Sequence, residues 1–442
     1  MIKTLQQYKF LSIFIVSIHL LYFLIALYFN GIYTIDSPGY LFQAQNLLKY
    51  HSLYAGDLMQ PIQNDYFALR PPFYAFFIIA CKAIYQSDYS VLFIQNILAI
   101  LLIINVLKTI SDLGVKPKIT NVILPICLVF YPAHFVYANT IMSDTIFEIL
   151  IFLLFKTTYS IYQKPAISKA LVIGLIISIS LITKPVSILI GLIVCVILLF
   201  IKNFPKIYIA YILIFPAIAY VSLSYAVQKE TGYFQFTSMK SFAAVRCLVK
   251  YSAANSYGPD YADSIASAIV SQSEQQTTLA ERYQYIDSSC NYFLLNHKMA
   301  FLKVYVKGCL TFTFDPGRYD LYKLFNANND NALGMYQTLQ QYGIKATLQF
   351  LLGINFWGLL ALAILICWNI LVVIVFALFL LKTHSPTFLK LLIAIFVMYF
   401  LLTTGVLGVS RYRIHIYPIL LMAILLWANQ SSFIRRLFRF KR

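Results

Sequence analysis

Long apolar runs, separated by short polar segments, occupy most of this chain. The first run extends from Phe10 to Phe29, about 20 residues, which is enough to cross a hydrocarbon core of about 30 Å. Lys3 and Lys9 precede it and no small-residue cleavage site follows it, so we expect an uncleaved first span that starts in the cytoplasm. Nine further strong runs follow, at residues 90–110, 119–139, 145–162, 170–183, 186–201, 207–226, 355–381, 388–404 and 414–428.

One apolar stretch, Pro72 to Tyr85, covers only about 14 residues, a length typical of an interfacial or re-entrant segment. If it does not cross the membrane, every short basic loop lies on the side where the chain begins, as the positive-inside rule requires. Those loops hold Lys108, Lys116, Lys118, Lys156, Lys164, Lys169, Lys202, Lys206, Lys382 and Lys390, and the tail adds Arg435, Arg436, Arg439, Lys441 and Arg442. The pattern predicts an all-α polytopic membrane protein with about ten transmembrane helices and both termini in the cytoplasm.

This topology divides the chain into three parts. Residues 1–226 form an N-terminal membrane module, whose first outer loop, 31–89, contains interfacial helices. Residues 227–354 form a large non-cytoplasmic region, which we expect to recognise the acceptor of any reaction. Residues 355–442 form the C-terminal membrane helices and a basic cytoplasmic tail. A short turn at 140–144 also faces the non-cytoplasmic side.

The large outer region is the part of the chain that most resembles a soluble module. We expect a surface helix at Ser264–Leu279 and a helix in the membrane interface at Phe301–Phe314. The region also contains Cys247, Cys290 and Cys309, of which one pair could form a disulfide, whereas an unpaired third argues against a disulfide framework.

Composition excludes several classes of protein. Hydrophobic residues make up 60% of the chain and charged residues only 11%, against about 25% charged residues in soluble domains. The net charge of +18 is therefore assigned to membrane topology and anionic lipids, and not to nucleic acid. No Walker loop, dinucleotide-binding glycine motif or zinc-protease motif is present, so nucleotide hydrolysis and metalloprotease chemistry have no support.

Two acidic positions stand out on the outer side. Asp36 precedes Tyr40 and Ala44 at helical spacing, just after the first span, so it is either an N-cap or a functional acid. Asp144 and Glu148 lie four residues apart at the outer end of a span, hence on one helix face. Ser143 or Asp144 could cap that helix, but ionisable groups at the depth of Glu148 are functional candidates by default.

Basic residues also gather at outer span ends, where the positive-inside rule does not explain them. They are Arg70, Lys184, Arg411 and Arg413. Snorkelling to the interface is one interpretation, and a clamp on an anionic head group is the other, because guanidinium forks suit phosphate oxygens. An acid beside such a clamp suggests transfer chemistry on a lipid phosphate, in which the phosphate leaves and a carboxylate acts as base.

Five short motifs, in their order along the chain, resemble those of the GT-C superfamily of membrane glycosyltransferases. They are Asp36-x3-Tyr40, Arg70-Pro-Pro-Phe-Tyr, Ser143-Asp144, Thr183-Lys184-Pro and Arg411-Tyr-Arg413. The likeness is greatest to the branch of protein O-mannosyltransferases and lipid A aminoarabinose transferases. It covers about residues 1–205 and 385–428. The resemblance implies a polyprenyl-phosphate-linked sugar donor, inverting transfer to a protein, lipid or glycan acceptor, and a cavity on the non-cytoplasmic face.

The resemblance also implies roles for single residues. Asp36 and Asp144 are the catalytic acids, with Asp36 as base, and Arg70, Lys184, Arg411 and Arg413 bind the donor phosphate. Tyr40, Glu148 and Asp65 orient the substrate, and Asp57 or Asp65 could replace Asp36 as base. Many relatives have two adjacent acids in the first loop, whereas Ser37 follows Asp36 here.

No metal site and no bound cofactor are therefore assigned, although a divalent cation stays open. His134 and His415 lie near outer span ends and could complete such a site, but lone histidines are more often structural.

Two other functions remain open at this level. A flippase or transporter of lipid-linked glycans also combines many spans with buried charge, but we find no Gly/Pro-interrupted segments in corresponding halves. A glycan polymerase or ligase differs from the main interpretation only in its acceptor.

We expect the membrane that holds this protein to be a bacterial plasma membrane.

Overall fold

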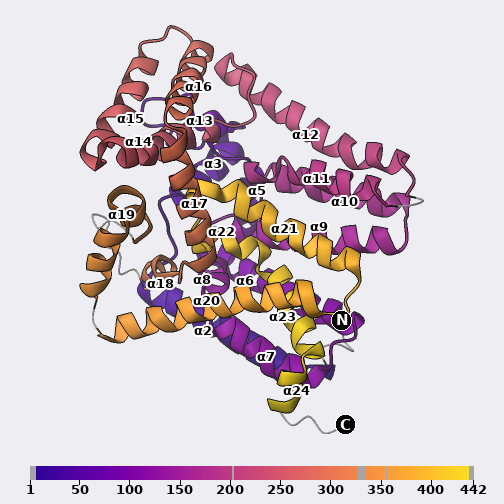
Figure 1. Ribbon diagram of the computed structural model, residues 1–442. Helices are drawn as coiled ribbons and strands as arrows, with labels where there is room; N and C mark the ends of the chain where they lie inside the picture. Colours follow the sequence, from indigo (N-terminus) through magenta and orange to yellow (C-terminus); the bar gives the residue numbers. More distant parts are fainter. Residues whose placement is uncertain (1–5, 202–203, 326–334, 355, 438–442) are drawn as a thin grey trace.

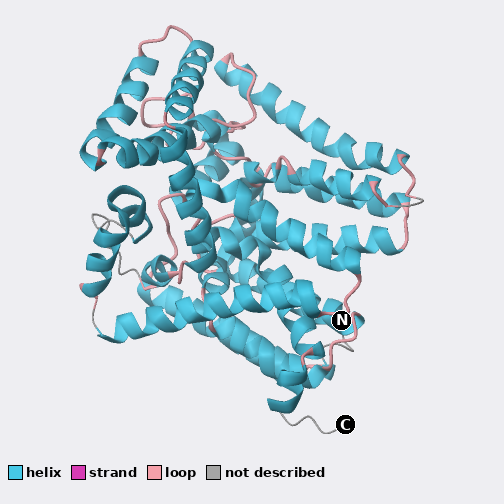
Figure 2. Ribbon diagram, in the orientation of Figure 1, coloured by secondary structure: helices cyan, strands magenta, loops and turns pink. Residues whose placement is uncertain are grey.

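The computed structural model describes residues 6–201, 204–325, 335–354 and 356–437. Throughout these residues the regular structure is helical, and they include no strand (Figure 2). This agrees with the predicted all-α class, because only helices and closed barrels satisfy backbone hydrogen bonds inside a bilayer.

Seven of the described helices are long and apolar enough to cross a membrane, which indicates a multi-pass membrane protein. Few of the large apolar side chains on α2 and α20 are buried, and about half are exposed, as expected of helices that face lipid. The candidate spans are α2 (Lys9–Phe29), α6 (Asp88–Asp112), α9 (Asp144–Gln163), α12 (Ile207–Thr231), α20 (Phe356–Lys382), α21 with the turn after it (Thr387–Leu407), and Ser410–Gln430, which ends in α23 (Tyr417–Gln430).

Three of the predicted spans correspond to shorter helices. The run at 119–139 divides into α7 (Pro117–Val129) and α8 (Ala133–Ala138), because Pro132 cannot continue a helix through its missing N–H. The pair at 170–183 and 186–201 becomes α10 (Ile167–Leu181) and α11 (Ile190–Leu199), interrupted at Lys184-Pro185. Each is below the roughly 17 residues needed for a span, so the count of ten is not established.

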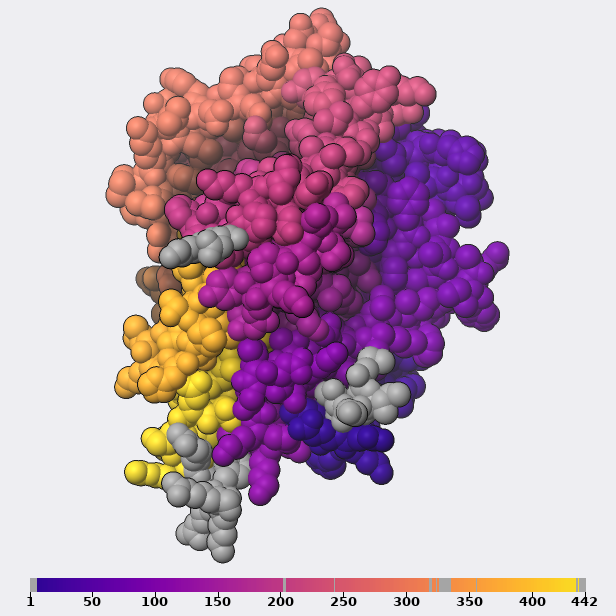
Figure 3. Space-filling view, turned by 90° about the vertical axis from the view of Figure 1, so that its right-hand side faces the viewer, coloured from indigo at the N-terminus to yellow at the C-terminus, as the bar shows by residue number. Residues whose placement is uncertain are grey.

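The most buried of the candidate spans is the one that ends in α23, which lies at the centre of the bundle. Nearly all of its residues are inaccessible to solvent, and it packs against α6, α7, α9, α20 and α21. Figure 1 shows the long helices running in broadly the same direction, with α2 beginning and α23 ending toward the same end of the bundle. Figure 3 looks onto that end, where N-terminal, middle and C-terminal segments meet.

Residues 31–89, predicted above to form the first outer loop, contain three short helices. They are α3 (Ser37–Tyr50), α4 (Tyr66–Leu69) and α5 (Phe73–Ile84). The apolar stretch at 72–85 thus forms a helix of 12 residues, too short to cross a bilayer unaided.

Residues 227–354, predicted above to form a large outer region, are mostly helical in their described part. Their helices are α13 (Met239–Ala243), a π-helical segment (Ala244–Val249), α14 (Lys250–Tyr257), α15 (Pro259–Glu274), α16 (Leu279–Asn296), α17 (Lys298–Phe314), α18 (Arg318–Leu324) and α19 (Met335–Leu352). The helix expected at Ser264–Leu279 is present as α15, but both bounds were wrong. It begins at Pro259 and stops at Glu274, and Thr278 and Glu281 form a capping box that starts α16.

The expected helix at Phe301–Phe314 is confirmed as α17, whose place relative to the membrane stays a prediction. The disulfide that one pair of outer-region cysteines could have formed is absent: Cys247, Cys290 and Cys309 are free thiols. Cys247 and Cys290 belong to different apolar clusters, and the Cys309 thiol faces the carbonyl of Leu401 on α21.

Glycines join α17 to the chain segment that follows α21. A Cβ at Gly308 would lie 2.8 Å from the carbonyl carbon of Gly405 and 2.9 Å from the Cα of Val406. The Gly408 carbonyl in turn accepts a hydrogen bond of 2.5 Å from Thr311. This backbone-to-backbone contact fixes the residues that lead directly into Ser410 and Arg411.

We expect Gly308→Ala to destabilise the protein by about 1–3 kcal/mol, since two backbones must separate to admit one methyl group. Thermal unfolding in detergent measures this effect. Gly353→Ala is the matched control, because a Cβ there meets only the Phe350 carbonyl at 3.5 Å and the Gln349 carbonyl at 3.9 Å. Equal melting temperatures for the two variants would show that the glycine contact does not hold α17 in place.

Candidate functional site

Asp36 is the last residue before α3, and its carboxylate does not cap the helix. The hydroxyl of Ser37 instead accepts a hydrogen bond from the Thr34 amide at 2.8 Å and donates one to the Ile141 carbonyl at 3.0 Å. Tyr40 adds a hydroxyl contact of 3.0 Å to Ser143. These bonds attach the first outer loop to the turn before α9 and leave the Asp36 carboxylate available for other partners.

Asp144 is the first residue of α9 and is fully buried. The N-cap position of α9 belongs to Ser143, whose side chain makes no capping hydrogen bond. The Asp144 Oδ1 atom lies 2.7 Å from Lys184 Nζ and 3.3 Å from His415 Nε2, and both carboxylate oxygens lie 3.3 Å from guanidinium nitrogens of Arg411. The capping interpretation of both acids is therefore wrong.

Arg411 connects the two acids. Its Nη1 atom lies 2.9 Å from Asp36 Oδ2, while its Nε and Nη2 atoms bind Asp144. Arg70 binds the other oxygen of Asp36 through Nη2 at 2.7 Å. We refer to these residues as the charged cluster: Asp36, Arg70, Asp144, Lys184, Arg411 and His415.

Five separate stretches of the chain supply the charged cluster. Asp36 precedes α3, Arg70 follows α4, and Asp144 starts α9. Lys184 lies between α10 and α11, where Pro185 follows it, and Arg411 lies in the short helix α22 (Ser410–Arg413). The two predicted catalytic acids, Asp36 and Asp144, thus lie together with three of the four basic residues that were predicted to bind phosphate.

The cluster has a buried end and an exposed end. The side chains of Asp144 and His415 are 0% exposed, and those of Lys184 and Arg70 are 11% and 12% exposed. Arg411 and Asp36 reach 23% and 25%. A molecule entering from solvent therefore meets Asp36 and Arg411 first.

Positive charge exceeds negative charge in the cluster, because three cations face two carboxylates. Burial opposes ionisation of Asp36, but Arg411 and Arg70 outweigh burial and hold its pKa below the usual value. Burial lowers the pKa of Lys184 to about 8, although Asp144 favours the charged form. At neutral pH the cluster is thus an ionised site with spare positive charge, suited to an oxyanion.

Three predicted site residues lie elsewhere. Arg413 is buried, and its guanidinium donates to the carbonyls of Thr313 at 2.5 Å and Asp315 at 2.9 Å. The prediction that Arg413 binds the donor phosphate is therefore wrong. Because Arg413 lies two residues after Arg411, its side chain points in a different direction, toward the end of α17. Glu148 lies one turn deeper than Asp144 and binds His134 Nδ1 at 3.0 Å.

Asp65 contacts the large outer region instead of the cluster. Tyr283 donates a hydrogen bond to its carboxylate, and Arg282 lies 3.4 Å away. Asp57 accepts a hydrogen bond from the Met59 amide at 2.9 Å. Neither acid is positioned to replace Asp36.

Metal binding gains no support from the described residues, which include no group of three or more histidine, cysteine or acidic side chains able to hold an ion. His134 pairs with Glu148 and His415 with Asp144, so the two histidines do not share a site.

Asp320 is a buried acid that sequence reasoning missed. Its oxygens accept hydrogen bonds of 2.7 Å from Tyr137 and 2.7 Å from Ser410, the residue before Arg411. The Tyr137 ring also lies 5.9 Å from the Arg411 guanidinium carbon. Asp315 binds the Ser410 amide at 2.8 Å. In the sequence, the turn motif Asp315-Pro-Gly marks this segment, but it does not distinguish Asp320 as a buried acid.

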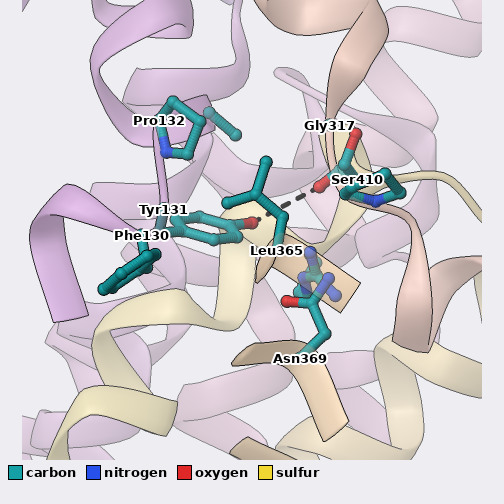
Figure 4. A pocket seen from close by; sticks show the side chains of 10 residues that line it. Phe130, Tyr131, Pro132, Gly317, Leu365, Asn369 and Ser410 are labelled. Atoms are coloured by element: carbon teal, nitrogen blue, oxygen red, sulfur yellow. Dashed lines mark hydrogen bonds between the residues drawn. The ribbon is translucent and has the colours of Figure 1, made fainter. Parts of the chain in front are cut away.

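A small cavity adjoins the same segment, lined in part by Tyr131, Asn369 and Ser410 (Figure 4). Figure 4 shows the Tyr131 hydroxyl directed at the Ser410 carbonyl, 3.3 Å away. The cavity volume is about 10 Å³, close to the space of a single water molecule. It is a packing gap and too small for a substrate.

Comparison with known proteins gives no match: no family model, no curated protein and no solved structure resembles this chain significantly.

We expect the stability difference between Asp320→Asn and the wild type to depend on pH. Burial raises the pKa of Asp320 from 3.8 to about 7, so between these values the folded protein keeps a proton that the unfolded chain releases. As pH rises from about 4 to about 7, the wild type therefore loses stability that the neutral Asn variant keeps, by an amount on the order of 4 kcal/mol.

Melting temperatures of both proteins at pH 5 and pH 8 measure this effect. Relative to the wild type, the melting temperature of Asp320→Asn should be higher at pH 8 than at pH 5. A relative stability that is constant, or that moves in the opposite direction, would contradict a raised pKa for Asp320.

Proposed function

We propose that this chain is an integral membrane glycosyltransferase that transfers a sugar from a polyprenyl-phosphate-linked donor to an acceptor. The observation that carries the proposal is the meeting of Arg70, Lys184 and Arg411 with Asp36 and Asp144 in one cluster. Such a cluster combines the two elements of the reaction, a cationic site for a leaving phosphate and a carboxylate for the acceptor.

In the proposed reaction an acceptor oxygen attacks the anomeric carbon, and the bond from that carbon to the phosphate oxygen breaks. The bonding electrons remain on the released polyprenyl phosphate, and the acceptor proton moves to Asp36. Asp144 holds Lys184 and Arg411 in position. Attack opposite the leaving phosphate inverts the anomeric centre.

Charge balance favours this assignment. The three cations offset the two carboxylates and the single negative charge of the donor phosphodiester. After transfer the released phosphate monoester carries one more negative charge, while Asp36 has become neutral. The site thus stays neutral before and after the reaction, which avoids the cost of an unpaired charge in a partly buried environment.

The proposal includes a location and a topology. The resemblance to GT-C enzymes and the loop charges support ten spans, with both termini cytoplasmic and the cluster on the non-cytoplasmic face of a bacterial plasma membrane. A site on that face has no access to cytoplasmic nucleotide sugars, in keeping with the lack of nucleotide-binding motifs in the sequence.

We expect Asp36→Asn to reduce transfer by at least about 100-fold, since the amide cannot accept the acceptor proton. The assay uses protein in liposomes with a panel of labelled polyprenyl-phosphate monosaccharides and a panel of peptide, lipid and glycan acceptors. It measures labelled acceptor together with conversion of phosphodiester to phosphate monoester. Asp57→Asn is the matched control, because Asp57 lies in the same loop outside the cluster.

Turnover by Asp36→Asn at the wild-type rate would refute the role of Asp36 as base. Movement of labelled lipid between leaflets without release of phosphate monoester would favour a flippase. Comparison of monosaccharide and oligosaccharide donors separates a polymerase or ligase from a transferase of single sugars.

A further inference from the structure

Asp36 and Asp144 share Arg411, but the protein holds the two carboxylates very differently. Asp144 is 0% exposed, starts a helix of 20 residues, and contacts Lys184, Arg411 and His415. Asp36 is 25% exposed, and the contacts of its carboxylate are with Arg70 and Arg411. No cap bond ties the Asp36 side chain to α3. Only the arginines therefore hold Asp36 in place.

The same two arginines would have to receive a phosphate. Arg411 already uses all three of its nitrogens on the two carboxylates. Arg70 binds Asp36 through Nη2, and its buried Nε has no hydrogen-bond partner. A phosphate that binds these forks bidentately must compete with a carboxylate for their donors. The carboxylate that can be displaced is Asp36, since Asp144 is enclosed.

We propose that the donor phosphate displaces Asp36 from Arg70 and Arg411, and that this exchange frees the base only once the donor is bound. This inference rests on the proposed function and adds a regulation to it. In the empty site Asp36 is neutralised by two cations and is a poor proton acceptor. When the phosphate takes over both arginines, the released carboxylate lies beside an anion, which favours its protonation.

The exchange makes the reaction ordered. The donor must bind before the acceptor hydroxyl can be deprotonated, and the base remains masked while no sugar is present. After transfer Asp36 carries the acceptor proton, so it does not compete with the newly formed phosphate monoester. Departure of the lipid phosphate and loss of that proton restore the two ion pairs.

The exchange predicts an unusual binding phenotype. Removing a catalytic carboxylate should strengthen phosphate binding, because the ligand no longer displaces a competitor. We expect Asp36→Asn to bind farnesyl phosphate at least about tenfold more tightly than the wild type, equivalent to 1.4 kcal/mol, while it fails to catalyse transfer. Asp36→Ala should behave in the same way, which guards against a folding defect in one variant.

Isothermal titration of the full-length protein in detergent measures the affinities, with melting curves as a check on folding. Farnesol tests whether the phosphate is recognised at all, and inorganic phosphate tests whether the lipid chain is needed. Asp57→Asn is the matched control and should bind farnesyl phosphate like the wild type. Arg70→Gln should bind it more weakly.

The outcomes separate this inference from the proposed function. Equal or weaker binding of farnesyl phosphate by folded Asp36→Asn and Asp36→Ala, with clear binding by the wild type, would overturn the exchange and leave the transferase proposal intact. If neither the wild type nor any variant prefers farnesyl phosphate to farnesol, the cluster is not a lipid-phosphate site and both proposals fail. Preference for inorganic phosphate over farnesyl phosphate would also overturn both, because the ligand would not be a lipid.

Discussion

The ion-pair bridge from Arg411 to Asp36 and Asp144 is the interaction on which the rest of the site depends. Asp144 is fully buried, and a buried carboxylate is tolerated only with charged and hydrogen-bonded partners. Because Arg411 also contacts Asp36, the same guanidinium connects the end of the membrane bundle to the first outer loop. Loss of this bridge would leave two acids facing each other without a common counter-ion.

Much of the fold serves to fix the backbone on either side of that bridge. The close contact of Gly308 with Gly405 and Val406 positions the segment before Arg411. Asp315 and Asp320 hold Ser410 from the large outer region. The large outer region therefore takes part in building the site, in addition to any role in recognising an acceptor.

The sequence predicted the helical class and the site better than it predicted the number of spans. Hydropathy finds apolar runs, but Pro132 interrupts the run at 119–139, and a hydropathy window does not register a break in a helix. The two runs on either side of Lys184-Pro185 form helices of only 15 and 10 residues. Asp36, Asp144, Arg70, Lys184 and Arg411 could be selected because charge at an outer span end is costly and needs a reason. Arg413 was misassigned because side-chain direction on a short helical turn depends on packing. Asp320 was missed because its partners lie far away in the chain.

The central claim is that the charged cluster receives a lipid phosphate. A structure of the protein with a polyprenyl phosphate bound tests it most directly. The account predicts the phosphate oxygens within about 2.7–2.9 Å of nitrogens on Arg70, Lys184 and Arg411, with Asp36 turned away from both arginines. A phosphate bound elsewhere, with the Asp36 ion pairs intact, would contradict it.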